Sequence, residues 1–185
     1  VVAYTLAVLL LKRQGLLPDS VKTQGPILTL HTKRGRQFLE WAAGPKRFWR
    51  AWANFGVGIA LVVMVGAFLF LLVSAVSILR DPGQVTAVNQ PRNVLVIPGV
   101  NDFLPLSVAP EIITGLAVGL IVHEGGHGLL CRVEDIDIES LGLAFLAFIP
   151  VGAFVEPDEE SQKNASRGGR TRMFAAGVTN NFAIT

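Results

Sequence analysis

Two long apolar runs dominate the pattern of hydrophobic and polar positions. Residues 55–79 hold no charged side chain, and residues 111–130 are apolar except for four ionisable side chains. An α-helix rises about 1.5 Å per residue, so each run is long enough to cross the roughly 30 Å hydrocarbon core of a bilayer. Pro110 and Glu111 are typical of the first turn of a helix. We therefore expect complete transmembrane helices over 55–79 and 111–130.

Two shorter apolar runs lie at the two ends of the sequence. Residues 1–11 and residues 173–185 are each too short to cross a bilayer alone. The first run begins with Val rather than Met, and the second stops within an apolar stretch. We interpret both runs as partial spans, which makes residues 1–185 a single integral-membrane domain that is truncated at both ends.

The region after the second long run predicts β structure. Residues 133–141 alternate, although imperfectly, with a period of two, which indicates a strand. Residues 142–155 are apolar but short, and a proline and a glycine interrupt them, so we expect a re-entrant hairpin there. The expected fold is therefore an α-helical polytopic membrane protein. It carries a small membrane-associated β hairpin, at about 133–155, next to the helix over 111–130.

Basic residues are concentrated in the polar segment that precedes the first long run. Residues 12–54 hold nine of the sixteen basic residues, with only Asp19 and Glu40 as acidic ones. Cytoplasmic loops of membrane proteins carry such an excess, so we place this polar loop in the cytoplasm and its tryptophans at the lipid headgroups. A basic loop can also bind nucleic acid, but direct attachment to a span favours the lipid bilayer as its partner.

The overall composition supports a membrane protein. Hydrophobic residues make up 51% of the chain and charged residues 16%, and the mean hydropathy is +0.50. A soluble domain carries about a quarter charged residues. The single cysteine excludes an internal disulfide framework, so cysteine content does not indicate a redox compartment.

Three polar side chains, His123, Glu124 and His127, form an H-E-x-x-H pattern within the helix over 111–130. Helical residues four apart share a face, so the two imidazoles can bind one metal ion. A catalytic zinc site combines three protein ligands with an open position, beside which Glu124 can act as general base. Two hydrogen-bonding histidines are the alternative, but ionisable side chains within a span are costly unless they serve a buried polar site. Cys131 is a further candidate ligand, for which we favour packing.

Three stretches of the chain, in this order, resemble a known family. Residues 122–128 read Val-His-Glu-Gly-Gly-His-Gly, residues 149–160 contain Pro-Val-Gly-Ala-Phe-Val, and residues 174–182 read Phe-Ala-Ala-Gly-Val-Thr-Asn-Asn-Phe. These segments resemble the site-2 protease family of intramembrane zinc metalloproteases, most closely its archaeal members. One departure is Gly177-Val178, where the family usually has Gly-Pro.

The resemblance implies an intramembrane zinc metalloendopeptidase that cleaves transmembrane segments of other membrane proteins. His123 and His127 are then zinc ligands, and Glu124 activates a zinc-bound water. The third ligand of the family is an aspartate from a later segment, which we expect beyond Thr185. We expect a multi-pass protein of the cell membrane, and the short distance from the histidines to Arg132 places the active site nearer the cytoplasmic side. Neither the substrate sequence nor the oligomeric state is indicated.

Two hypotheses concern the surroundings of this site. The strand over 133–141 can pair with a locally unwound substrate by β-augmentation, because an intact substrate helix hides its carbonyl groups. Asn181 is expected either to contact the substrate or to pack between helices.

The alternative function is that of a non-catalytic membrane protein, either an inactive protease relative or a metal transporter. Transporters spread ionisable residues over several helices along a path. Here these residues cluster at 123–127, which favours one catalytic centre. A membrane protease that processes prenylated proteins also uses H-E-x-x-H, but the stretches 149–160 and 174–182 favour the site-2 type.

Overall fold

The structure is a computed structural model that describes residues 10, 13–15, 20–24, 27–32, 35–81, 90–146 and 149–185. The partial span expected over 1–11 lies outside these residues, apart from Leu10. The chain divides into two compact units, and each is described by itself. Val1–Val57 and Leu120–Thr185 form the first unit, and Gly58–Gly119 forms the second.

An antiparallel sheet in the first unit consists of β1 (Val21–Gln24), β2 (Ile27–Thr32), β3 (Ile138–Leu146) and β4 (Ile149–Pro157). The strands lie in the order β1-β2-β3-β4, so β3 is paired on both sides and β4 is an edge strand. Within β3, Gly142 lies so close to the Phe154 ring and the Leu30 carbonyl oxygen that a Cβ atom would clash. The glycine therefore allows the two neighbouring strands to pack against β3 at this point.

The β prediction was right in kind and wrong in extent. The strand predicted over 133–141 starts only at Ile138, because the preceding helix continues through Val133 and Asp135 turns the chain with a φ of 57°. The hairpin predicted over 142–155 is present as the remainder of β3 together with β4, and its re-entry into a membrane stays a prediction. The hairpin forms half of a four-stranded sheet, since β2 pairs with the other side of β3.

The polar loop predicted over 12–54 contains regular structure. β1 and β2 lie within it, followed by α2 (Arg36–Ala42) and the first turns of α3 (Lys46–Arg80). β2 pairs with β3 over its whole length, from Ile27 opposite Leu146 to Thr32 opposite Leu141. This pairing joins segments that are far apart in the sequence, so no local sequence pattern predicts it.

α3 and α5 (Ala109–Val133) cover the two predicted spans and extend beyond them. α3 begins at Lys46 rather than at residue 55, and the buried Ala53 lies on this added part. α5 begins two residues before and ends three residues after the predicted 111–130. α3, and α5 together with the preceding 3-10 turn η2 (Leu106–Val108), are long and apolar enough to cross a membrane. They are the two candidate spans in the part of the chain that the structure describes.

Two capped helices, α6 (Glu159–Asn164) and α7 (Arg167–Ile184), follow the sheet. Asp158 accepts a hydrogen bond from the Ser161 backbone N–H at 2.8 Å, and Ser166 accepts one from that of Gly169 at 3.0 Å. Such caps satisfy backbone N–H groups that have no partner within the helix. With Ser166 as its N-cap, α7 starts six residues before the apolar run predicted over 173–185. Insertion of that run into a membrane stays a prediction.

The second unit contains the remainder of α3, the short helix α4 (Pro91–Val94), η2 and the start of α5. Asn101 holds the loop of this unit together: its side chain donates hydrogen bonds to the carbonyl oxygens of Asn93 and Leu95, each at 3.0 Å. Arg92 pairs with Asp102 at 2.9 Å. These polar contacts hold residues 92–102 together.

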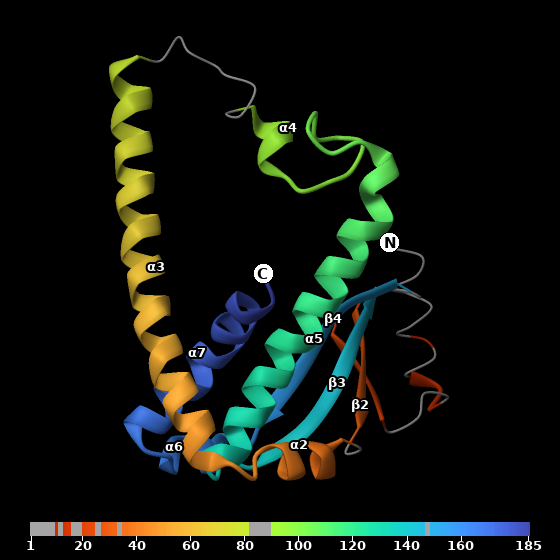
Figure 1. Ribbon diagram of the computed structural model, residues 1–185. Helices are drawn as coiled ribbons and strands as arrows, with labels where there is room; N and C mark the ends of the chain where they lie inside the picture. Colours follow the sequence, from red (N-terminus) through yellow and green to blue (C-terminus); the bar gives the residue numbers. More distant parts are fainter. Residues whose placement is uncertain are drawn as a thin grey trace. The chain divides into compact units, whose positions relative to one another are not determined.

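The hydrophobic core of the first unit surrounds the end of α5. Leu130, Cys131 and Val133 are almost fully buried there, together with Met173 and Ala176 of α7. Figure 1 shows α7 lying between the first turns of α3 and the last turns of α5. The core therefore fixes the helical turn that directly follows the H-E-x-x-H pattern.

Glu134, the first residue after α5, joins three helices through its buried carboxylate. Arg172 donates to it from Nε at 2.8 Å and from Nη2 at 2.9 Å, and Arg50 donates from Nε at 3.1 Å. Burial opposes ionisation, but the hydrogen bonds and charges of Arg172 and Arg50 outweigh it and lower the pKa of Glu134 below its usual 4.5. Glu134 therefore stabilises the fold as a carboxylate.

We predict that Glu134→Gln lowers the free energy of unfolding by about 1.5–3 kcal/mol, the usual worth of hydrogen bonds to charged groups. Because the pKa is lowered in the folded state, this stabilisation is present above pH 4.5 and is lost as the pH falls further. Thermal unfolding in detergent across this pH range measures both effects. Glu159→Gln removes the exposed partner of Lys163 and serves as the control, with little expected change. If Glu134→Gln were as stable to unfolding as the wild-type protein at neutral pH, the prediction would be contradicted.

Candidate active site

His123 and His127 lie one turn apart in the part of α5 that belongs to the first unit. The centroids of their rings are 4.9 Å apart, and the ring planes are inclined by 72°. α7 supplies a hydrogen-bond partner to each ring. The two imidazoles therefore share one face of α5, the face that packs against α7.

The position of the proton on His127 follows from its partner in α7. Nδ1 of His127 lies 2.7 Å from the carbonyl oxygen of Met173. A carbonyl oxygen only accepts hydrogen bonds, so Nδ1 carries the proton and the neutral ring keeps a lone pair on Nε2. Histidine ligands of metal ions take this form, with one ring nitrogen free and the other donating to an oxygen.

The ring of His123 packs against a glycine of α7. A Cβ atom at Gly177 would lie 2.5 Å from Nε2 and 2.6 Å from both Cδ2 and Cε1 of His123. These near-equal distances place that atom over the face of the ring, so Gly177 makes room for the imidazole without covering the edge that carries Nε2. On the other side of the ring, Nδ1 lies 3.2 Å from Nδ2 of Asn181.

Glu124 is held by the edge strand of the sheet. Its Oε2 accepts a hydrogen bond from the backbone N–H of Val155 in β4 at 3.1 Å. Val155 lies opposite Leu141 of β3 in the register, yet its N–H points to α5 instead of to β3. The outer edge of β4 therefore faces the carboxylate of the motif.

Small residues allow the helices around the motif to approach one another. A Cβ atom at Gly126 would clash with the Asn180 side chain and would lie 3.0 Å from the Ala176 carbonyl oxygen. Asn180 in turn accepts a hydrogen bond from Trp52 Nε1 of α3 at 3.0 Å. Gly56 of α3 is equally close to α7, against the Thr179 side chain. α7 is therefore packed tightly against both α5 and α3.

The two histidines have no third ligand among the residues that the structure describes. Cys131 is buried in the core, where packing was the favoured interpretation. His31 lies in β2, and its two ring nitrogens contact Thr29 Oγ1 at 3.0 Å and Ser140 Oγ at 2.8 Å. The donor set suits zinc in kind, with two imidazoles beside an acid, and the third ligand stays predicted beyond Thr185.

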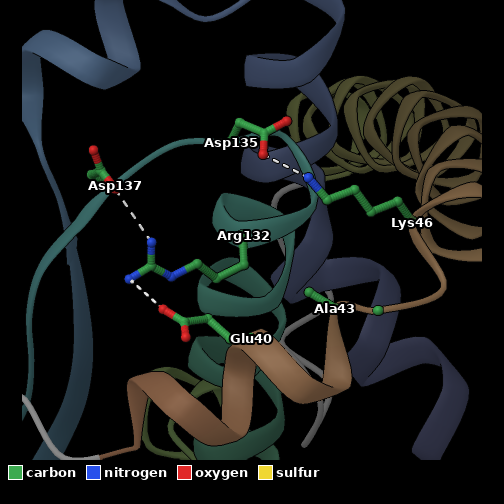
Figure 2. A pocket seen from close by; sticks show the side chains of 7 residues that line it. Glu40, Ala43, Lys46, Arg132, Asp135 and Asp137 are labelled. Carbon is green, nitrogen blue, oxygen red and sulfur yellow. Dashed lines mark hydrogen bonds and ion pairs between the residues drawn. The ribbon is translucent and has the colours of Figure 1, made fainter.

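A polar pocket of about 360 Å³ beside the end of α5 contains none of the three motif residues. Figure 2 shows its charged side chains paired with one another. Lys46 pairs with Asp135 at 2.6 Å, and Arg132 pairs with Asp137 at 3.3 Å and with Glu40 at 3.6 Å. Because each cation that lines the pocket faces a carboxylate of the same pocket, we interpret it as a structural contact rather than a binding site.

Sequence reasoning missed the groups that hold the motif in place. Two of them, the Met173 carbonyl oxygen and the Val155 N–H, belong to the backbone and leave no residue-specific signal. Asn181 was expected to pack between helices or to contact the substrate; in the structure it contacts His123 of the neighbouring helix α5, and a substrate contact stays a prediction. The available signal was the presence of Gly177 and Asn181 in the third stretch of the family resemblance.

Comparison with known protein families matches residues 111–185 to peptidase family M50. A protein of Methanocaldococcus jannaschii, itself uncharacterized, is 28% identical over 167 residues, which cover 89% of this chain and 43% of that protein. The chain therefore spans less than half the length of this curated relative. No solved structure matches the chain. The family match confirms the resemblance to the site-2 proteases: residues 111–185 are similar to peptidase family M50.

Proposed function

We propose that this protein is an intramembrane zinc metalloendopeptidase that cleaves transmembrane segments of other membrane proteins. The observation that carries the proposal is the pair of imidazoles on one face of α5, of which His127 is held by Met173 in the tautomer that binds metal ions. The match of residues 111–185 to peptidase family M50 supports the reaction type. The length and hydropathy of α3 and α5 support a location in the membrane.

In this proposal His123 and His127 hold zinc together with a third ligand from a segment beyond Thr185. Zinc, when bound, acts as a Lewis acid that acidifies a water molecule and polarises the scissile carbonyl group. The Met173 carbonyl oxygen keeps the His127 ring in one orientation and raises its basicity as a ligand. The close packing of α7 on α5 therefore supports metal binding directly.

Glu124 is the proposed general base. It follows His123 directly on α5, and the hydrogen bond from the Val155 N–H fixes one of its carboxylate oxygens. Glu124 takes a proton from the attacking water and then delivers it to the leaving amine of the cleaved peptide. One carboxylate thus serves as base and acid in turn.

β4, rather than the strand predicted over 133–141, is the proposed docking site for an unwound substrate segment. β3 has no free edge, because β2 and β4 pair with its two sides. The outer edge of β4 faces Glu124, as the direction of the Val155 N–H indicates. An extended peptide that pairs with this edge brings its backbone beside the general base.

We also propose a multi-pass protein of the cell membrane whose active site lies nearer the cytoplasmic side. His127 is six residues from Val133 at the end of α5, about 9 Å along the helix. Arg132 lies at this end, and basic residues flank spans mainly on the cytoplasmic side. The active site would then be reached from the cytoplasmic face.

We predict about one zinc ion per chain in the full-length protein purified in detergent, and its loss in His127→Ala. Plasma mass spectrometry of the purified protein measures the metal content. His31→Ala is the matched control: it removes a histidine whose ring nitrogens both contact the sheet, and it should keep the zinc. If the wild-type protein, prepared without chelators, contained no metal, the proposal would fail in favour of an inactive relative.

Glu124→Gln should keep the zinc but reduce cleavage by at least about 100-fold, because an amide cannot take the proton. The assay incubates the protein in micelles with single-span membrane proteins that carry helix-breaking residues, and mass spectrometry quantifies the fragments. Glu159→Gln, an exposed position in α6, controls for the loss of one carboxylate. Cleavage by Glu124→Gln at the wild-type rate would show that another group is the base.

Ala153→Pro tests the docking of substrate on β4. Ala153 lies two residues before Val155, so its N–H also points away from β3, and proline removes this donor without breaking the ladder to β3. We expect cleavage to fall several-fold at unchanged zinc content. Ala153→Val keeps the N–H and should cleave normally. Equal cleavage by the two variants would exclude an added strand at this edge.

A further inference from the structure

Three residues of α7 form a single stripe against the histidines of α5. Met173, Gly177 and Asn181 follow one another at intervals of four, so they share a helix face. Met173 contacts Nδ1 of His127 through its carbonyl oxygen, and Gly177 lies against the face of the His123 ring. Asn181 contacts Nδ1 of His123. Each histidine therefore has its Nδ1 directed at a polar group of the same helix.

The hydrogen bonds of Asn181 are incomplete in this arrangement. Its Nδ2 donates to Nδ1 of His123 at 3.2 Å, while its buried Oδ1 has no hydrogen-bond partner among the described residues. A donor opposite Nδ1 requires a lone pair on that nitrogen, which places the proton of the neutral ring on Nε2. His123 in this tautomer has no lone pair on Nε2 for a metal ion.

A half-turn of the Asn181 amide exchanges its oxygen and its nitrogen. Oδ1 then accepts a hydrogen bond from the Nδ1–H group of His123 and gains the partner that it lacks. The lone pair of His123 moves to Nε2, and the ring takes the same form as that of His127. The amide can thus hold either tautomer of His123, whereas the Met173 carbonyl holds only one of His127.

We propose that Asn181 is a positioning residue that sets the tautomer of His123. When zinc binds, its amide oxygen accepts a hydrogen bond from the Nδ1–H group of His123, and the proton stays on Nδ1. This inference rests on the proposed zinc site. Asn181 raises the zinc affinity indirectly, by orienting the ring of His123. Oxygen acceptors that bind the second ring nitrogen of metal-bound histidines raise metal affinity in the same way.

The adjacent asparagine in α7 has a different role. Asn180 accepts from Trp52 Nε1 at 3.0 Å and packs against Gly126, so it fastens α7 to α3 and α5. Asn180 therefore packs between helices, whereas Asn181 contacts the ring of His123. Changes at Asn181 should leave the packing made by Asn180 in place.

Two substitutions of similar size separate the hydrogen bond from packing. Asn181→Asp supplies a carboxylate that only accepts and should bind zinc at least as tightly as the wild-type protein. Asn181→Leu has no acceptor and should bind zinc about 10–100-fold more weakly. Competition between the full-length protein in detergent and a chromophoric zinc chelator measures the affinity. Nitrogen-15 NMR of the histidine rings should show a proton on Nδ1 of His123 in the zinc-loaded wild-type protein.

The outcomes distinguish this inference from the proposed function on which it rests. If the wild-type protein binds zinc and Asn181→Leu binds it with the same affinity, the inference about Asn181 is overturned but the proposed function is not. Equal weakening in both variants would also overturn it, because loss in Asn181→Asp would indicate packing rather than hydrogen bonding. A wild-type protein that binds no zinc would overturn both. Thermal unfolding of the zinc-free variants, expected to match the wild type, checks that the fold is intact.

Discussion

α5 and α7 approach so closely at Gly126 and Gly177 that neither position has room for a Cβ atom. Hydrogen bonds weaken over a few tenths of an ångström, so a side chain at either glycine would push the Met173 carbonyl oxygen out of reach of His127. Glycine costs about 1 kcal/mol relative to alanine inside a helix. That cost is offset by the contacts that the close approach permits, and the orientation of His127 and His123 depends on it.

Segments from both sides of α5 in the sequence hold this packing in place. Gly128 leaves room for Leu39 of α2 and Val155 of β4, and Val155 also donates to Glu124. Glu134 fastens the end of α5 to α3 and α7 through two arginines. The motif itself occupies five residues, but its geometry requires the sheet, the core and the first turns of α3. This explains why the first unit joins a stretch near the start of the sequence to its last third.

The elements that could be predicted are those whose signal is local. The apolar runs predicted α3 and α5, and the errors at their ends arise where buried Ala53 and Val133 extend a helix past its apolar run. β2 escaped prediction because its register with β3 joins residues that lie more than a hundred positions apart, as with His31 opposite Gly142. The period-two pattern indicated a strand but could not distinguish a free hairpin from a four-stranded sheet.

The candidate site divides in the same way between local and non-local groups. His123 and His127 are visible in the sequence because their spacing matches the helical turn, and Glu124 because it lies between them. Met173 leaves no signal, since any residue supplies a carbonyl oxygen at that point of α7. Asn181 differs, because only a side chain with an acceptor can hold the Nδ1 proton of His123. The hydrogen bond to His127 therefore depends only on the path of the α7 backbone, because a carbonyl oxygen makes it. The contact with His123 depends on the identity of one side chain, that of Asn181.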